Sequence, residues 1–122
     1  MLQALRDHPN IIKLHDMYFM NTQKMKDSAF VLSFEYADRG DLHRYVCNLK
    51  QDITIKKPSA SVDFKFIRNV LIQICEGINY MHSKGFIHRD LKTANILLRA
   101  GKQGDKYPQV KIADFGLSRN VR

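Results

Sequence analysis

Three polar side chains in the last third of the chain have the types and spacing that metal-assisted phosphoryl transfer needs. Asp90 and Asn95 lie five residues apart, and Asp114 follows in the sequence Asp-Phe-Gly. Mg²⁺ prefers hard oxygen ligands, so we expect Asn95 and Asp114 to bind this metal. Asp90 is then free to orient a hydroxyl group and accept its proton. Lys92 would balance the negative charge of the transferred group. We predict Asp90, Lys92 and Asn95 as catalytic residues.

Each of these residues adjoins one of three short apolar runs, which we expect to be strands. The runs are Phe86–His88, Ile96–Arg99 and Val110–Ala113. A loop over residues 100–108 joins the last two, and it is longer than a tight hairpin requires.

The clearest periodic pattern predicts a helix from Val62 to Lys84. Apolar residues recur here at spacings of three and four, which is typical of a helix with one buried face. Ser61 is the predicted N-cap, and Gly85 is predicted to follow the last turn. The apolar positions are Ile67, Val70, Leu71, Ile74, Cys75, Ile78 and Met81.

Two earlier segments are rich in β-branched and aromatic residues and predict an antiparallel hairpin. These strands cover residues 11–19 and 29–36, and a polar turn over residues 21–28 joins them. The other predicted elements are the end of a helix at residues 2–8, a short helix at residues 42–48 and a polar connection at residues 51–61.

Length and composition limit the class of protein. With 122 residues, 44% hydrophobic and 26% charged, the chain has the composition of one globular domain at most. No apolar run reaches the length of a membrane span. Cys47 and Cys75 lack the spacing of a disulfide framework or a common zinc site. We therefore expect a cytoplasmic protein, with the nucleus as the alternative.

Two features that suggest other partners are weak in this sequence. The formal net charge of +8, from 20 Lys and Arg against 12 Asp and Glu, suits a phosphate-rich partner. The basic residues are scattered and do not alternate with aromatic residues, so we expect no nucleic-acid partner. We also expect surface or capping roles for the histidines that have no partner at metal-ligand spacing, which are His8, His15, His43 and His82.

The polar motifs resemble two motifs of the eukaryotic protein kinase family, H-R-D-L-x-x-x-N and D-F-G. Here they read His88-Arg89-Asp90-Leu91-Lys92-Thr93-Ala94-Asn95 and Asp114-Phe115-Gly116. The resemblance implies an α+β, protein kinase-like fold. It also implies transfer of the γ-phosphoryl group of ATP to Ser or Thr hydroxyls of proteins, with Mg²⁺ as the metal cofactor.

The same resemblance implies where ATP binds. Glu35, Tyr36 and Ala37 match the family's hinge, whose backbone binds the adenine edge. Asp41 matches an acidic residue that meets the ribose, and Leu97 matches the apolar floor under the adenine.

The resemblance covers the whole chain as a single partial kinase domain. Residues 1–37 match the end of the small lobe and the hinge, and residues 38–122 match the first half of the helical large lobe. The family's glycine-rich loop, strand-three lysine and A-P-E segment are not in the sequence. We therefore expect a fold truncated at both ends that is inactive alone.

Two alternatives remain open from the sequence. A kinase-like chain without catalysis could serve as a binding module, or the parent enzyme could be a tyrosine kinase. The sequence Asp90-Leu91-Lys92 favours a Ser/Thr kinase, because kinases of that class resemble one another in placing Lys two residues after the catalytic Asp. Neither the protein substrate nor the oligomeric state follows from these residues.

Overall fold

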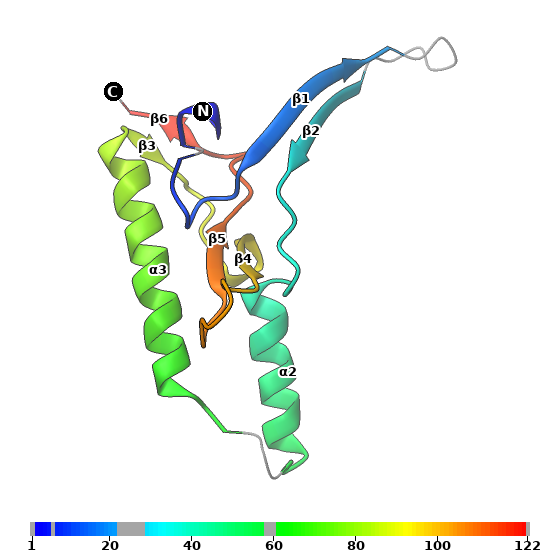
Figure 1. Ribbon diagram of the computed structural model, residues 1–122, viewed down its shortest axis with the longest axis vertical. Coiled ribbons are helices and arrows are strands. Elements are labelled where there is room, and N and C mark those ends of the chain that lie inside the picture. The colour runs from blue at the N-terminus through cyan, green and yellow to red at the C-terminus, as the bar shows by residue number, and fades with distance from the viewer. Residues whose placement is uncertain (1, 6, 22–28, 58–60, 122) are drawn as a thin grey trace.

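The computed structural model describes residues 2–5, 7–21, 29–57 and 61–121. A β-hairpin occupies one end of the molecule, two long helices extend toward the other, and a short two-stranded sheet lies between them (Figure 1). The mixture of separate helices and antiparallel strand pairs confirms the predicted α+β class. Among the described residues, no helix combines the length and apolar character that a membrane crossing requires.

The predicted hairpin is present. Strands β1 (Leu14–Met20) and β2 (Ala29–Phe34) pair antiparallel, while residues 22–28 of the predicted turn lie outside the described residues. Strand β1 starts later than predicted because Ile12 pairs elsewhere: its N–H donates to the carbonyl of Ile112 at 2.9 Å. The segment before β1 is thereby joined to the central sheet.

The central sheet consists of β4 (Ile96–Arg99) and β5 (Gln109–Ile112), again antiparallel. Strand β3 (Phe86–Ile87) pairs instead with β6 (Arg119–Asn120), which the sequence did not predict. The two polar residues of β6 carry no strand pattern, and only their pairing with β3 makes them a strand.

Helix α2 (Leu42–Thr54) is longer than the predicted residues 42–48, so the first part of the predicted connection is helical. Its N-cap is Asp41, whose carboxylate accepts the N–H of Arg44 at 2.7 Å. Leu49, Lys50 and Gln51 all favour helix, which explains the extension. Short helical segments also occur at α1 (Leu2–Leu5) and at η1 (Thr93–Asn95), a turn of 3-10 helix.

Helix α3 (Phe64–Ser83) lies within the predicted range, but Asp63 and not Ser61 is its N-cap. The Asp63 carboxylate accepts two N–H groups, from Lys65 at 3.0 Å and Phe66 at 3.1 Å. Gly85 has a φ of 82°, the left-handed conformation expected just after a helix. Both helices thus begin at an aspartate that satisfies free amide groups.

The core lies where α3 covers the β4–β5 sheet. Its buried residues are Phe66, Val70, Ile96, Leu98, Val110 and Ile112, and a second cluster joins Leu5, Ile11, Met81 and Phe86. Part of the predicted apolar stripe of α3 lies outside this core: Ile67 is 39% exposed, Leu71 is 54% exposed, and Cys75 is also exposed. The sequence pattern of α3 is therefore wider than the face that the described chain buries.

Candidate active site

His88 connects the two polar motifs. Its Nδ1 accepts the N–H of Asp90 at 3.1 Å, so Nε2 carries the proton and donates to the carbonyl of Ala113 at 2.8 Å. The imidazole is 1% exposed and lies 5.0 Å from the ring of Phe115, measured between centroids. One buried side chain thus holds the backbone at Asp90 and the residue before Asp114.

The side chains of Asp90, Lys92 and Asn95, which we predict to be catalytic, lie close together. Asn95 Nδ2 donates to the Asp90 carbonyl at 2.9 Å and lies 3.3 Å from the Asp90 carboxylate. Lys92 Nζ is 3.9 Å from the other carboxylate oxygen of Asp90. The turn η1 creates this arrangement by bringing Asn95 back toward Asp90. The carboxylate therefore has a cation and an amide beside it, while keeping access to solvent.

Asp114 occupies a strained turn after β5. Its φ is 59°, in the left-handed region that few residues other than glycine adopt. The N–H of Gly116 lies 3.4 Å from its carboxylate, and the N–H of Ala113 donates to the carbonyl of Asn95 at 2.9 Å. Arg89 also has a positive φ, 68°, and its Nε donates to the Leu117 carbonyl at 2.6 Å. Such strain is concentrated at functional sites in proteins.

A cavity of about 620 Å³ lies between the β1–β2 hairpin and the Asp114 turn. Its walls are mostly apolar, with Asp114 at one side, which suits a flat aromatic ligand that carries charged groups at one end. The apolar residues that line it include Ile12, Leu14, Leu32, Phe34 and Leu97.

The five residues expected to contact a nucleotide are not all at this cavity. Glu35 and Leu97 line it, whereas Tyr36, Ala37 and Asp41 do not. The side chain of Tyr36 points to solvent, at 81% exposure, and the Asp41 carboxylate caps α2. Asp41 pairs through its backbone with Leu97, so it lies next to the cavity without lining it.

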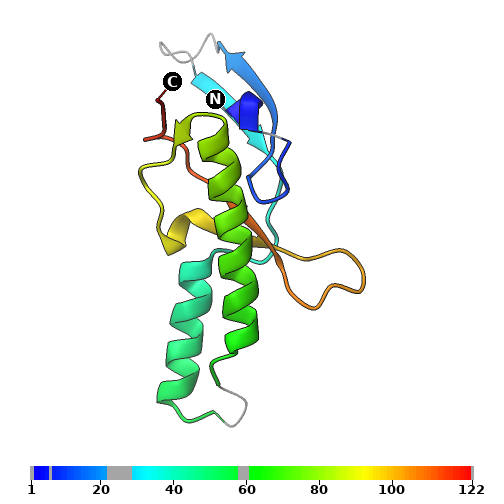
Figure 2. The same cartoon turned by 90° about the vertical axis from the view of Figure 1, so that its left-hand side faces the viewer.

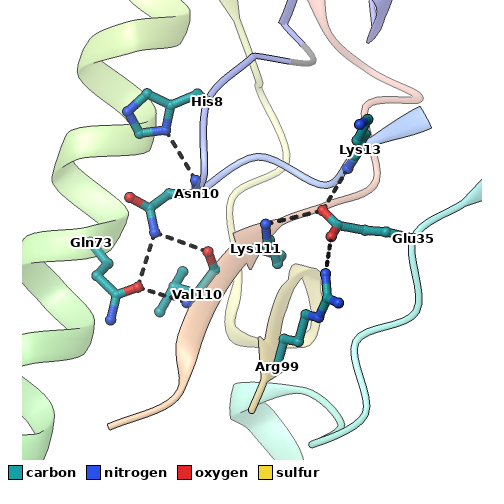
Figure 3. A network of polar contacts seen from close by, with 8 residues as sticks. All are labelled: His8, Asn10, Lys13, Glu35, Gln73, Arg99, Val110 and Lys111. Carbon is teal, nitrogen blue, oxygen red and sulfur yellow. Dashed lines mark hydrogen bonds and ion pairs between the residues drawn. The ribbon is translucent and has the colours of Figure 1, made fainter. Parts of the chain in front are cut away.

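Besides lining the cavity, Glu35 forms ion pairs through its carboxylate that the sequence did not reveal (Figure 3). The carboxylate is 3.1 Å from Lys111 Nζ and 2.7 Å from Arg99 Nη1, and it accepts the N–H of Lys13 at 2.9 Å. Burial acts to raise the pKa of Glu35, but the Lys13 amide and the Lys111 ammonium outweigh it and lower the pKa. Glu35, the first residue of the predicted hinge, is thereby fixed to β4 and β5. A lysine inside the apolar run Val110–Ala113 was the available signal, because a buried lysine needs an acidic partner.

Next to this ion pair, an amide network joins three separate segments (Figure 3). Asn10 Nδ2 donates to Gln73 Oε1 on α3 and to the carbonyl of Val110 on β5, both at 3.0 Å. Gln73 Oε1 also accepts the N–H of Val110 at 2.8 Å, and His8 Nδ1 accepts the N–H of Asn10 at 3.1 Å. The segment before β1 is therefore attached to the same strand that carries Lys111.

Comparison with known proteins gives one family and several relatives. The family model described as "Protein kinase domain" matches residues 1–122. The chain is 38% identical to "Tyrosine-protein kinase receptor svh-2" of Caenorhabditis elegans, over 94% of the chain and 9% of that protein. It is 36% identical to "Probable serine/threonine-protein kinase nek1" of Dictyostelium discoideum, over 95% of the chain and 24% of that protein. It is 32% identical to "Serine/threonine-protein kinase DCLK3" of Homo sapiens, over 98% of the chain and 16% of that protein. The chain thus spans less than a quarter of the length of each of these relatives.

Proposed function

We propose a function for the complete domain from which this chain comes, because the chain belongs to the protein kinase family. That domain transfers the γ-phosphoryl group of ATP to Ser or Thr hydroxyls of a protein. The observation that carries this proposal is the environment of the Asp90 carboxylate. It has Lys92 Nζ at 3.9 Å and Asn95 Nδ2 at 3.3 Å on different oxygens. A base, a cation and an amide are thus adjacent to one another.

In this proposal Asp90 orients the attacking hydroxyl and accepts its proton. His88 supports that role through the backbone, because its hydrogen bonds to Asp90 and Ala113 restrain the loop. Lys92 is close enough to Asp90 to offset the negative charge that develops on the transferred group. Positioning and charge stabilisation supply most of the catalysis in phosphoryl transfer, so these side chains would contribute the hydroxyl-orienting part of the site, and the remaining parts of a complete kinase domain would hold the phosphates.

The donor atoms near Asp90 fit a hard divalent cation, which we propose to be Mg²⁺. The amide nitrogen of Asn95 faces Asp90, so its amide oxygen remains available as a metal ligand. Asp114 adds a carboxylate at the cavity wall. Mg²⁺ binds through one or two such protein oxygens together with phosphate and water. A cation held there supplies positive charge to the phosphate oxygens of the nucleotide.

We propose that the adenine of ATP enters the cavity between the hairpin and the Asp114 turn. Leu97 on β4 would lie under the ring, and the backbone of Glu35, Tyr36 and Ala37 would bind its polar edge. The ion pairs of Glu35 with Arg99 and Lys111 support this assignment, because they restrain a residue that lines the cavity. Asp41 would meet the ribose after a change at its capping bond to Arg44.

The preference for Ser and Thr over Tyr is supported by Lys92. A seryl or threonyl hydroxyl is on a short side chain, so it must approach Asp90 closely, where Lys92 can bridge it to the phosphate. The names of two relatives above contain "serine/threonine-protein kinase", and one contains "Tyrosine-protein kinase". The alternative of a tyrosine kinase is therefore kept as an outcome of the test.

The test uses a peptide library on the complete kinase domain that contains this segment. Peptides that differ only in a Ser, Thr or Tyr acceptor are compared for phosphate incorporation. We expect Ser and Thr to exceed Tyr, and Lys92→Ala to lower kcat far more than it weakens ATP binding. Lys50→Ala, an exposed position on α2, is the control and should leave both quantities unchanged. A dominant tyrosine signal would overturn the Ser/Thr assignment.

A further inference from the structure

We propose that His43 and Cys47 form a surface site for Zn²⁺, separate from the phosphoryl-transfer site. The two residues lie four positions apart on α2 and so share one face of the helix. Cys47 Sγ is 3.5 Å from His43 Nε2, and both side chains are exposed. Thiolate sulfur and imidazole nitrogen are the ligand atoms that zinc takes most often in proteins.

The separation of the two atoms matches a shared tetrahedral ion. Zinc bonds are about 2.3 Å to sulfur and about 2.0–2.1 Å to nitrogen, which places the two ligand atoms about 3.6 Å apart at a tetrahedral angle. The observed separation of 3.5 Å is close to this value. The Cys47 thiol loses its proton to solvent when it binds as thiolate.

The other nitrogen of His43 has a partner of the kind that metal-binding histidines use. Nδ1 lies 3.5 Å from Thr93 Oγ1, which can accept its proton and so direct Nε2 toward Cys47. Thr93 belongs to η1, which packs at the start of α2 (Figure 2). A cation on His43 and Cys47 would thereby also favour the contact between α2 and the loop that carries Lys92, because the two equilibria are linked.

The pair supplies two ligands, and water or a solute can complete the coordination. Within the part of the chain that the structure describes, no group of three His, Cys, Asp or Glu side chains is placed to hold a metal. Binding is therefore weaker than at structural zinc sites, which use four protein ligands. This proposal differs from the expectation of a surface or capping role for His43, and the sequence signal that supports it is a cysteine four residues after a histidine on one helix.

Cobalt titration of the 122-residue chain tests the proposal, because Co²⁺ replaces zinc and reports a bound thiolate through a charge-transfer band in the near ultraviolet. We expect the band in the wild-type chain, its displacement by Zn²⁺, and its loss in Cys47→Ser and His43→Gln. Cys75→Ser is the matched control: Cys75 is also exposed and helical, and no histidine lies three or four residues from it. This variant should retain the band.

Thr93→Val tests whether the partner of His43 Nδ1 supports metal binding. Loss of the partner of Nδ1 should weaken Co²⁺ binding by about 10-fold, while circular dichroism shows unchanged helix content in every variant. The proposal is overturned if the wild-type chain gives no thiolate band, if His43→Gln leaves cobalt affinity unchanged, or if Cys75→Ser removes the band.

Discussion

Lys111 Nζ lies 3.1 Å from the carboxylate of Glu35, and both side chains are buried. This ion pair connects Glu35, the first residue of the predicted hinge, to the strand that leads into Asp114. It also places two charges where solvent is largely excluded, so removing one partner leaves the other uncompensated. The contact therefore predicts how stability responds to substitution and to pH.

Replacing Lys111 by Met should lower the free energy of unfolding by about 2–3 kcal/mol. Breaking a fully buried pair costs about 3–5 kcal/mol, and the remaining contact between Arg99 and Glu35 reduces that cost. Urea denaturation measures the difference. Arg99→Met is the matched comparison, and it should cost about 1 kcal/mol or less because Arg99 is half exposed. Equal losses of unfolding free energy in the two variants would show that the burial of Lys111 does not determine how much its ion pair with Glu35 contributes.

The lowered pKa of Glu35 predicts a dependence of stability on pH. A carboxyl group whose pKa is lower in the folded state stabilises the fold above its unfolded pKa, near 4.5, and this contribution is lost as pH falls through the folded value. The stability difference between wild type and Glu35→Gln should therefore be constant at neutral pH and shrink below pH of about 4.5. Denaturation at a series of pH values measures it. A difference that stays constant into acid would contradict the assignment.

Gly77 lies where α3 packs closely against Ile112 of β5 and the backbone of Asn10. A Cβ atom there would lie 2.8 Å from Ile112 Cδ1 and 3.2 Å from the carbonyl of Asn10. We expect Gly77→Ala to destabilise the chain by about 1–3 kcal/mol through this overpacking, despite the better helix propensity of Ala. Thermal denaturation provides the measurement. Asn79→Ala, at an exposed position on the same helix, should change stability by about 0.5 kcal/mol at most; equal effects would refute the packing argument.

We predict that ATP binding depends on a metal ion at the Asp114 end of the cavity and on the free space beside Leu97. Asp114→Asn removes the charge of a proposed metal ligand, so it should abolish the Mg²⁺-dependent part of ATP binding. Leu97→Trp fills the cavity, so it should weaken binding with or without Mg²⁺. Calorimetry with and without the cation distinguishes the two effects. ATP binding that is insensitive to both substitutions would place the nucleotide elsewhere.

The sequence was most informative where one local signal decides the structure. Strand β4 has the predicted bounds, because an apolar run between polar residues is sufficient to define it, and the positive φ of Gly85 was predictable from its place after a long apolar helix. The structure brings Asp90, Lys92 and Asn95 close together, and their catalytic roles stay a prediction.

The sequence was least informative where a distant partner decides. Ser61 and Asp63 are both good N-caps, and the choice between them depends on where α3 meets the β4–β5 sheet. Strand β6 exists only because Arg119 and Asn120 lie beside β3. The Glu35 and Lys111 side chains are 76 positions apart, so no spacing rule relates them. Contacts of this kind follow from the assembled fold.

The most direct test of the proposed function is phosphate transfer from γ-labelled ATP in the complete kinase domain carrying Asp90→Asn. This change preserves the size of the side chain and its neighbours and removes the base. We predict that phosphate incorporation into Ser and Thr falls by at least about 100-fold. Asp52→Asn, at a half-buried position on α2 whose carboxylate pairs with Lys57, should retain wild-type turnover. Turnover of Asp90→Asn within a few-fold of wild type would contradict the account.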